Sequence, residues 1–417
     1  MAHQNSNDFL TIEDLEPEGK TILVRADLNT PVDSKGRLIE RMRIEESAVT
    51  LRDLSKSKVV VCSHQGRVGR SDYIPMEQHA QALTEILGRK VEFIDDVHGP
   101  AARRRISELR EGEILMLDNL RFCAEEAQEY SPEQAVKTQI VMKLAPFFDG
   151  FVLDAFPTAH RAHPSIVGFP EVLPTAGGRL VAKELKAMGR IQQVEKGPFI
   201  AVLGGSKVSD RLEAITALIE NKRADKVLLC GLAGLAFLKA AGRYKPDLNI
   251  SDGQAAVARA SKLLEEYPDV FEMPVDLAIE DEAGGRKEVD VDSLPSNAKA
   301  LDIGTKTIQS YEKVIRSGGT VFMSGPAGAF ERPEFGKGTE ELLRILATSY
   351  GTTIVSGGHL STALKVFNIH SWIDHVSSAG GALILYLAGK ELPLIKSLQK
   401  SAKKYRSNEY REKRIQV

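Results

Sequence analysis

Short, uninterrupted apolar runs alternate with helix-like segments along almost the whole chain, and this alternation limits the possible folds most strongly. The runs are residues 21–24, 58–61, 113–116, 150–153, 199–203, 226–229, 319–323 and 352–355. Strands that are apolar throughout are covered on both faces, which is typical of parallel sheets. Because parallel strands need crossover helices, the pattern predicts an α/β fold with two doubly wound, Rossmann-like parallel-sheet domains.

The length of 417 residues also favours two domains, since one compact core seldom serves so long a chain. Helical patterns occupy residues 43–54, 76–87 and 132–144. Proline and glycine between residues 170 and 178 precede a long helical pattern that ends at the break 196–198. We therefore divide the chain into a first domain (1–178), a hinge helix (179–196), a second domain (197–388) and a basic tail (389–417).

The tail is rich in basic side chains, namely Lys400, Lys403, Lys404, Arg406, Arg411, Lys413 and Arg414. Glu409 and Glu412 interrupt this run. The mixture favours a solvated helix or a segment that docks on the first domain over an arm for nucleic acid.

Overall composition excludes several classes of protein. The formal net charge of −2 argues against a nucleic-acid coat or a membrane-surface protein, so any basic site has to be local. The cysteines Cys62, Cys123 and Cys230 are far apart, which indicates a reducing compartment. The polar N-terminus is no secretory signal, and no stretch approaches the roughly 18 apolar residues of a membrane helix. We expect a cytoplasmic protein, monomeric or homodimeric, without nucleic-acid or membrane partners.

Residues 154–163 combine an acid, a guanidinium and two imidazoles directly after a predicted strand. These are Asp154, His160, Arg161 and His163. Arg161 is suited to binding a planar anion such as phosphate or carboxylate. Taken alone, the segment fits a capped turn with a surface arginine equally well.

Other predicted strand ends in the first half also carry cations. The whole set comprises Arg25, Arg43, His64, Arg67, Arg121 and Arg161, with Asp27 and Asn29 beside them. Arg43 begins a helix, where its charge is unfavourable unless an anionic ligand compensates it. Because the carboxyl ends of parallel strands meet at one edge, these groups should converge there. Such a cluster predicts a ligand with at least two anionic ends, one of them a phosphate.

Glycines take the corresponding strand-end positions in the second half. Residues 203–210 contain Gly204, Gly205 and Lys207 just before a helix, whose N-terminus suits a phosphate. Residues 231–234, 325–328 and 357–358 follow other strands. Tight turns explain each motif singly, but together they predict a flat surface for a nucleotide. The G-x-x-x-x-G-K-[ST] loop and the G-x-G-x-x-G fingerprint are both absent.

In their order and spacing these motifs resemble those of phosphoglycerate kinases over nearly the whole chain. The matching stretches are residues 25–31, 63–67, 119–122, 154–163, 204–210, 325–331 and 357–358. The resemblance implies that 3-phosphoglycerate is held by Asp27, Asn29, Arg43, His64, Arg67, Arg121 and Arg161. It implies a nucleotide site formed by Gly204, Gly205, Lys207, Arg211, Gly231, Pro326, Glu331, Gly357, Gly358, His359 and Leu360. Glu331 would bind the ribose.

The implied reaction is reversible phosphoryl transfer from 1,3-bisphosphoglycerate to ADP, giving 3-phosphoglycerate and ATP, a step of glycolysis and gluconeogenesis. Mg²⁺ would bind together with ATP or ADP. The carboxylate is a good leaving group, so catalysis would depend on alignment and on well-placed cations. Arg43 and Lys207 are the candidate catalytic residues. Because neither half contains both, the domains are expected to close about the helix at residues 179–195.

The sequence departs from the family pattern around the nucleotide. His359 stands where the family supplies a carboxylate near magnesium, and neutral imidazole is a poor ligand for that ion. We therefore assign no protein metal ligand and expect phosphates and water to hold the magnesium. Ser324 and Arg211 replace other common residues. In having a histidine after the double glycine, the chain resembles archaeal members of the family.

Three alternatives remain open at this point. A non-catalytic phosphate-binding protein with a decayed nucleotide site would explain the departures at His359, Ser324 and Arg211. A metal hydrolase would use His160 and His163 together with His64 and His359, although no carboxylate completes an H-E-x-x-H pattern and the arginines would repel a cation. A dinucleotide-dependent dehydrogenase fits the fold class but lacks the fingerprint.

Overall fold

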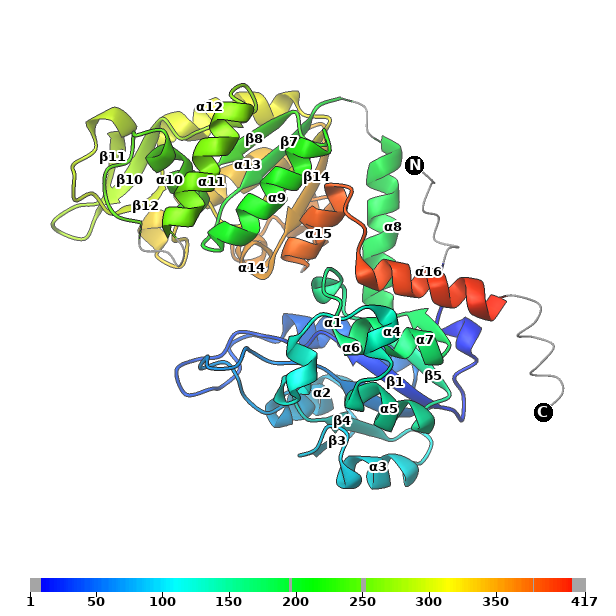
Figure 1. Ribbon diagram of the computed structural model, residues 1–417. Coiled ribbons are helices and arrows are strands. Elements are labelled where there is room, and N and C mark those ends of the chain that lie inside the picture. The colour runs from blue at the N-terminus through cyan, green and yellow to red at the C-terminus, as the bar shows by residue number, and fades with distance from the viewer. Residues whose placement is uncertain (1–8, 195–196, 249–252, 378, 407–417) are drawn as a thin grey trace. The chain divides into compact units, whose positions relative to one another are not determined.

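The computed structural model describes residues 9–194, 197–248, 253–377 and 379–406. The chain forms two compact units (Figure 1): one extends to Gly189 and resumes at Glu391, and the other runs from Arg190 to Lys390. Each contains a six-stranded sheet in which all paired strands are parallel. The central strands are buried along their whole length, so both sheet faces are covered. The predicted fold class is therefore confirmed.

The first sheet has the strand order β3-β4-β2-β1-β5-β6. Its strands are β1 (Thr21–Ala26), β2 (Lys58–Cys62), β3 (Val91–Ile94), β4 (Ile114–Leu117), β5 (Gly150–Asp154) and β6 (Thr175–Gly177). The connecting helices include α1 (Met42–Asp53), α2 (Glu77–Leu87), α3 (Pro100–Ser107), α6 (Pro164–Val167) and α7 (Phe169–Val172). Strand order reverses at β1, which has β2 on one side and β5 on the other. Ligands of open α/β sheets bind outside such a reversal point.

The second sheet has the order β15-β14-β13-β7-β8-β9, and its order reverses at β7. Its strands are β7 (Phe199–Leu203), β8 (Lys226–Leu229), β9 (Phe271–Glu272), β13 (Thr320–Ser324), β14 (Thr352–Ser356) and β15 (His375–Ser377). Its helices are α9 (Val208–Glu220), α10 (Gly231–Ala240), α11 (Gly253–Glu266), α12 (Thr305–Ser317), α13 (Lys337–Ala347), α14 (Gly358–Val366) and α15 (Gly380–Leu387). The glycine-rich loops after β7 and β13 lie at the reversal point.

A third, antiparallel sheet in the second unit was not predicted. It has the order β11-β10-β12, with β10 (Asp276–Glu280), β11 (Arg286–Asp290) and β12 (Ala300–Ile303). β11 is largely exposed and contains Arg, Lys, Glu and Asp, so it lacks the continuous apolar run on which the strand predictions were based. Short 3-10 helices complete the described structure: η1 (Glu13–Leu15), η2 (Leu120–Phe122), η3 (Ala124–Ala127), η4 (Ala145–Phe147), η5 (Phe156–Thr158), η6 (Val291–Ser293), η7 (Pro333–Phe335) and η8 (His370–Trp372).

The single helix predicted over residues 132–144 is wrong. The structure has two helices there, α4 (Pro132–Ala135) and α5 (Gln139–Leu144). The Thr138 hydroxyl donates to the Ala135 carbonyl at 2.7 Å, and the Glu125 carboxylate accepts the first two N–H groups of α5 at 2.9 and 3.2 Å. These side chains satisfy the backbone groups that a helix break exposes, so two short helices replace one.

The predicted hinge helix is α8 (Arg179–Val194), and residues 195 and 196 lie outside the described residues. Its first turn is capped by one residue of the first sheet and one of α1. Asp154 at the end of β5 accepts the Val181 N–H at 3.0 Å, and the Thr50 hydroxyl accepts the Arg179 N–H at 2.9 Å. Asp154 is 1% exposed, so this acid stabilises the start of α8 and does not face a ligand.

The described part of the basic tail is helix α16 (Pro393–Arg406), which packs on the first unit. The Ser401 hydroxyl accepts the Thr175 N–H of β6 at 2.9 Å, and Lys400 pairs with Glu171 at 2.7 Å. The last three basic residues of the tail, Arg411, Lys413 and Arg414, lie outside the described residues. In the part of the chain that the structure describes, no helix has the length and apolar character needed to cross a membrane.

Candidate active site

In the first unit, Arg43 is paired with a buried carboxylate. It lies in the first turn of α1, and its Nη1 donates to Asp27 Oδ2 at 3.0 Å. Asp27 follows β1 directly and is 1% exposed, whereas the Arg43 side chain keeps 21% of its surface. The expectation that only a ligand would compensate Arg43 is therefore corrected, because Asp27 supplies an anion from within the protein.

The loops after β1, β2 and β4 are tied to one another by side chains. Asn29 Oδ1 accepts the Gly66 N–H at 2.9 Å, and Arg121 donates to the Gly66 carbonyl. Asn119 Oδ1 accepts the Gln65 N–H at 3.1 Å. Asn29 is thus more than a turn residue, since it holds the β2 loop in place beside its own.

Arg25 does not belong with the ligand-facing cations, contrary to the sequence-based expectation. Its side chain is fully buried. Nε donates to the Ser165 hydroxyl at 2.9 Å, and Nη2 lies 3.1 Å from His64 Nδ1. The buried carboxyl of Glu126 is 3.9 Å from Nη2. Sequence reasoning missed Glu126 and Ser165, because neither stands at a strand end.

Both imidazoles at this edge are held in the neutral form. Burial, followed by the charges of Arg25, Arg121 and Arg43, lowers the pKa of His64 well below its usual value. Burial, followed by the charges of Arg25 and Arg121, lowers the pKa of His163 to about 3. His163 is the N-cap residue of α6, but its side chain makes no capping hydrogen bond.

The remaining cations keep access to solvent. Arg67 is exposed. The pKa of Arg121 is lowered by burial, then by the charge of Arg25 and then by that of Arg67. The Arg161 side chain is 43% exposed and pairs with Glu129 at 3.4 Å. Its charge contributes to the lowered pKa of His163. At the carboxyl end of the first sheet, Arg43 and Arg121 therefore act on His64, Arg121 and Arg161 act on His163, and Arg67 acts on Arg121.

In the second unit, three glycine-containing loops approach each other backbone to backbone. Gly205 donates to the Pro326 carbonyl at 2.8 Å. A Cβ on Gly231 would lie 2.6 Å from the Gly205 nitrogen, and one on Gly325 would lie 2.2 Å from the Gly204 oxygen. The close packing of the three loops thus requires glycine at these positions, and the surface that the loops form consists mainly of backbone atoms.

Cationic residues stand where α9 begins, beside these loops. Lys207 is the N-cap residue of α9 and is exposed. Arg211 in the next turn donates from Nε to the Gly204 carbonyl at 3.0 Å. The first N–H groups of the helix and the lysine together form a surface suited to phosphate.

His359 and Glu331 pair with each other at the start of α14. His359 Nδ1 lies 3.3 Å from Glu331 Oε1, and their side chains are 69% and 59% exposed. Gly357, the N-cap residue, has φ +108°, and Gly358 begins the helix. Leu360 is fully buried in the hydrophobic core. Its side chain cannot contact a nucleotide, so any contact from this position is made by the backbone.

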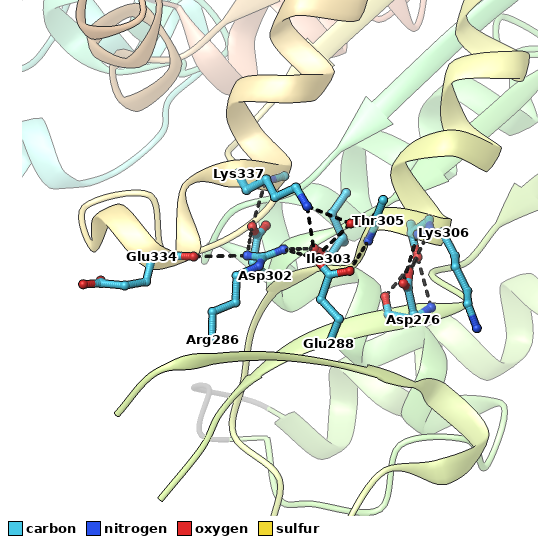
Figure 2. Close-up of polar contacts among 11 residues, drawn as sticks. Asp276, Arg286, Glu288, Asp302, Ile303, Thr305, Lys306, Glu334 and Lys337 are labelled. Carbon is cyan, nitrogen blue, oxygen red and sulfur yellow. Dashed lines mark hydrogen bonds and ion pairs between the residues drawn. The ribbon is translucent and has the colours of Figure 1, made fainter. Parts of the chain in front are cut away.

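An ionic network ties the unpredicted antiparallel sheet to the loop that carries Glu331 (Figure 2). Arg286 of β11 donates to Asp302 of β12 at 2.7 Å, and Asp302 accepts the Gly338 N–H of α13 at 2.7 Å. Arg286 also donates to the Glu334 carbonyl at 3.3 Å. Because Glu334 lies only three positions after Glu331, this hydrogen bond restrains the loop that carries Glu331.

The comparisons with known proteins agree with this arrangement. The family model "Phosphoglycerate kinase" matches residues 12–390. A phosphoglycerate kinase of Methanobacterium bryantii is 43% identical over 94% of this chain and 97% of its own. That of Sulfurisphaera tokodaii is 41% identical over 94% and 95%.

The solved structures give the same result. The crystal structure of the enzyme from Pyrococcus horikoshii is 37% identical and has a TM-score of 0.86, covering 95% of this chain and all of that one. The structure of phosphoglycerate kinase from Coxiella burnetii is 30% identical with a TM-score of 0.70, covering 94% and 100%. The chain therefore belongs to the phosphoglycerate kinase family.

Proposed function

We propose that the chain transfers a phosphoryl group reversibly between the acyl phosphate of 1,3-bisphosphoglycerate and ADP, with phosphoglycerate on the first unit and nucleotide on the second. Family membership supports the reaction, which is a phosphotransfer to a carboxyl group. The observation that carries the assignment of the first unit is that Arg43 and Arg121, both partly exposed, lie close enough to a buried, neutral His64 to lower its pKa, after burial and Arg25. Nothing favours the non-catalytic alternative.

In the first unit, the phosphate and carboxylate of the substrate would be bound by cations and directed donors. Arg67, Arg121 and Arg161 supply guanidinium groups, which bind planar anions through paired N–H donors. Asp27 holds Arg43 in position and Asn29 holds the β2 loop, and through these contacts both would shape the phosphoglycerate site. A ligand with two anionic ends matches this distribution of charge.

In the second unit, the nucleotide would lie over the loops containing Gly204, Gly205, Gly231 and Pro326. A surface made mainly of backbone atoms leaves room for a flat base. Lys207 and the N-termini of α9 and α14 would bind the phosphates. Arg211 supports the loop through the Gly204 carbonyl. Glu331 would accept ribose hydroxyl groups.

Magnesium would enter with ADP or ATP and would neutralise phosphate charge. The nearest side chains fit it poorly, because His359 presents an imidazole and its partner Glu331 is assigned to the ribose. Mg²⁺ prefers oxygen ligands and retains several waters in most protein sites. We assign its coordination to the phosphates and water, with no ligand from the protein.

Catalysis would depend on positioning and on electrostatic stabilisation. The leaving carboxylate needs no proton, so no general base is required. Arg43 and Lys207 would stabilise the charge on the transferring phosphoryl group. Because these residues belong to different units, the reaction requires domain closure, and α8 is the element about which it would occur. Closure would also exclude water from the acyl phosphate.

The decisive experiment is an assay of ATP formation from 1,3-bisphosphoglycerate and ADP, coupled to hexokinase and glucose-6-phosphate dehydrogenase. We expect turnover that depends on magnesium and on both substrates. Binding of 3-phosphoglycerate without any ATP formation would refute the proposal in favour of the non-catalytic alternative. A cytoplasmic location and a monomeric or homodimeric state stay predictions.

A further inference from the structure

The buried network beneath His64 determines the chemical form of that histidine. Arg25 Nη2 lies 3.1 Å from His64 Nδ1, and both side chains are buried. A guanidinium carries donors only, so Nδ1 has to accept the hydrogen bond and cannot itself carry a proton. The proton of the neutral ring is then on Nε2.

The surrounding charges exclude the doubly protonated ring. Burial, followed by the charges of Arg25 from β1, Arg121 from η2 and Arg43 from α1, lowers the pKa of His64. An imidazolium would also direct its Nδ1–H against the N–H groups of Arg25. The site therefore presents one directed donor at this position and no additional positive charge.

Two further buried residues hold Arg25 in this geometry. The Ser165 hydroxyl accepts from Arg25 Nε at 2.9 Å and donates to Glu126 Oε1. The Ser165 backbone N–H donates to Glu126 Oε2 at 3.1 Å, so both oxygens of the carboxyl are used. Glu126 and Ser165 have no exposed surface. Because the three residues come from β1, η3 and α6, the chain of hydrogen bonds is a product of the tertiary structure.

We propose that Glu126 and Ser165 are positioning residues which, through Arg25, keep His64 in the Nε2–H tautomer as a neutral hydrogen-bond donor to an anionic oxygen of the phosphoglycerate. The inference rests on the proposed function, in which His64 contacts that substrate. The Nδ1–H tautomer would turn a lone pair toward the substrate and repel its oxygen. The network thus selects the form that can bind.

The tautomer is measured directly by ¹⁵N NMR of the full-length, ligand-free protein labelled on histidine, at pH 7. The His64 signals are identified by their loss in His64→Gln. We expect a protonated Nε2 and an unprotonated Nδ1. A predominant Nδ1–H tautomer or an imidazolium would overturn the inference, whether or not the enzyme is active.

The role of the network is tested with Ser165→Ala, which removes the acceptor of Arg25 Nε. We expect a second tautomer of His64 and a Kd for 3-phosphoglycerate about threefold to tenfold higher, as for one lost hydrogen bond. The Kd for ADP should not change. Ser57→Ala is the matched control, because its hydroxyl is equally buried and donates to the Pro17 carbonyl at 2.8 Å. It should leave the tautomer and both affinities unchanged.

If Ser165→Ala keeps the wild-type tautomer of His64 and the wild-type Kd for 3-phosphoglycerate, the positioning role is contradicted. If that variant does not fold, the wild-type spectrum still decides the tautomer. A wild-type protein with the Nε2–H tautomer that does not bind 3-phosphoglycerate refutes the substrate assignment, and with it the donor role. The failure of the inference and that of the proposed function are therefore distinguishable.

Discussion

Replacing Arg43 with alanine separates its structural role from its catalytic one. The guanidinium is 3.0 Å from Asp27, whose side chain is 1% exposed. After the change, Asp27 keeps the Asn29 N–H at 3.1 Å but loses its charged partner. The variant therefore leaves a buried carboxylate poorly satisfied and also removes a cation from the site.

These two losses have different readouts. Removing one partner of a buried ion pair costs about 3–5 kcal/mol, and the 21% exposure of the Arg43 side chain puts this pair at the lower end of that range. This is less than the roughly 5–15 kcal/mol that stabilises most proteins. The variant should therefore remain folded at 25 °C. Loss of one preorganised charge from the transition state costs about 3 kcal/mol, which lowers kcat about 100-fold or more.

The assay is the coupled measurement of ATP formation, together with urea unfolding. Arg52→Ala is the matched control, because Arg52 is an exposed residue of the same helix, at its C-terminal end, whose Nη2 donates to the Ile86 carbonyl at 3.1 Å. It should keep kcat within about twofold. Near-normal turnover in Arg43→Ala, with only a lower stability, would show that the residue serves to pair with Asp27. In that case the assigned catalytic role is wrong.

Three further predictions concern other parts of the site. The pKa of His163 is lowered to about 3 in the folded protein, so the unfolded chain takes up a proton at this residue at a higher pH than the folded one. The stabilising contribution is therefore lost as the pH falls from 6.5 toward 3. His163→Gln should reduce that slope by about 1.4 kcal/mol per pH unit in urea unfolding, and an unchanged slope would contradict it. His359→Asp should tighten binding of magnesium-ADP in calorimetry, and an unchanged magnesium dependence would count against the metal argument. Gly231→Ala, whose Cβ would lie 2.6 Å from the Gly205 nitrogen, should weaken ADP binding about tenfold and spare 3-phosphoglycerate binding. Its control is Gly242→Ala, which has a similar positive φ but nothing within 4 Å, and equal effects of the two changes would refute the packing argument.

Eight of the parallel strands were predictable because they are mainly apolar runs buried on both faces. The short strands β3, β6, β9 and β15 were missed, because they are not continuous apolar runs. β7 and β8 have the predicted bounds, and β1 differs only at its end. β11 was missed because an exposed strand in a small antiparallel sheet needs no apolar run. The break between α4 and α5 was missed for another reason, since Glu125, a residue outside the helical pattern, stabilises it.

The sequence alone determined eight of the parallel strands and the residue types near their carboxyl ends, and hence the family and the presence of two α/β units. A strand end is a local property, and parallel pairing brings such ends to one edge. Which of those residues face solvent was decided only by the tertiary structure. Arg25 and Arg121 both follow strand patterns, yet Glu126 and Ser165 from other segments bury Arg25, while Arg121 keeps access. Leu360 is likewise a core residue, because it belongs to a hydrophobic cluster formed by strands and helices that are distant in sequence. Exposure depends on neighbours that are distant in sequence, so it could not be derived from local pattern.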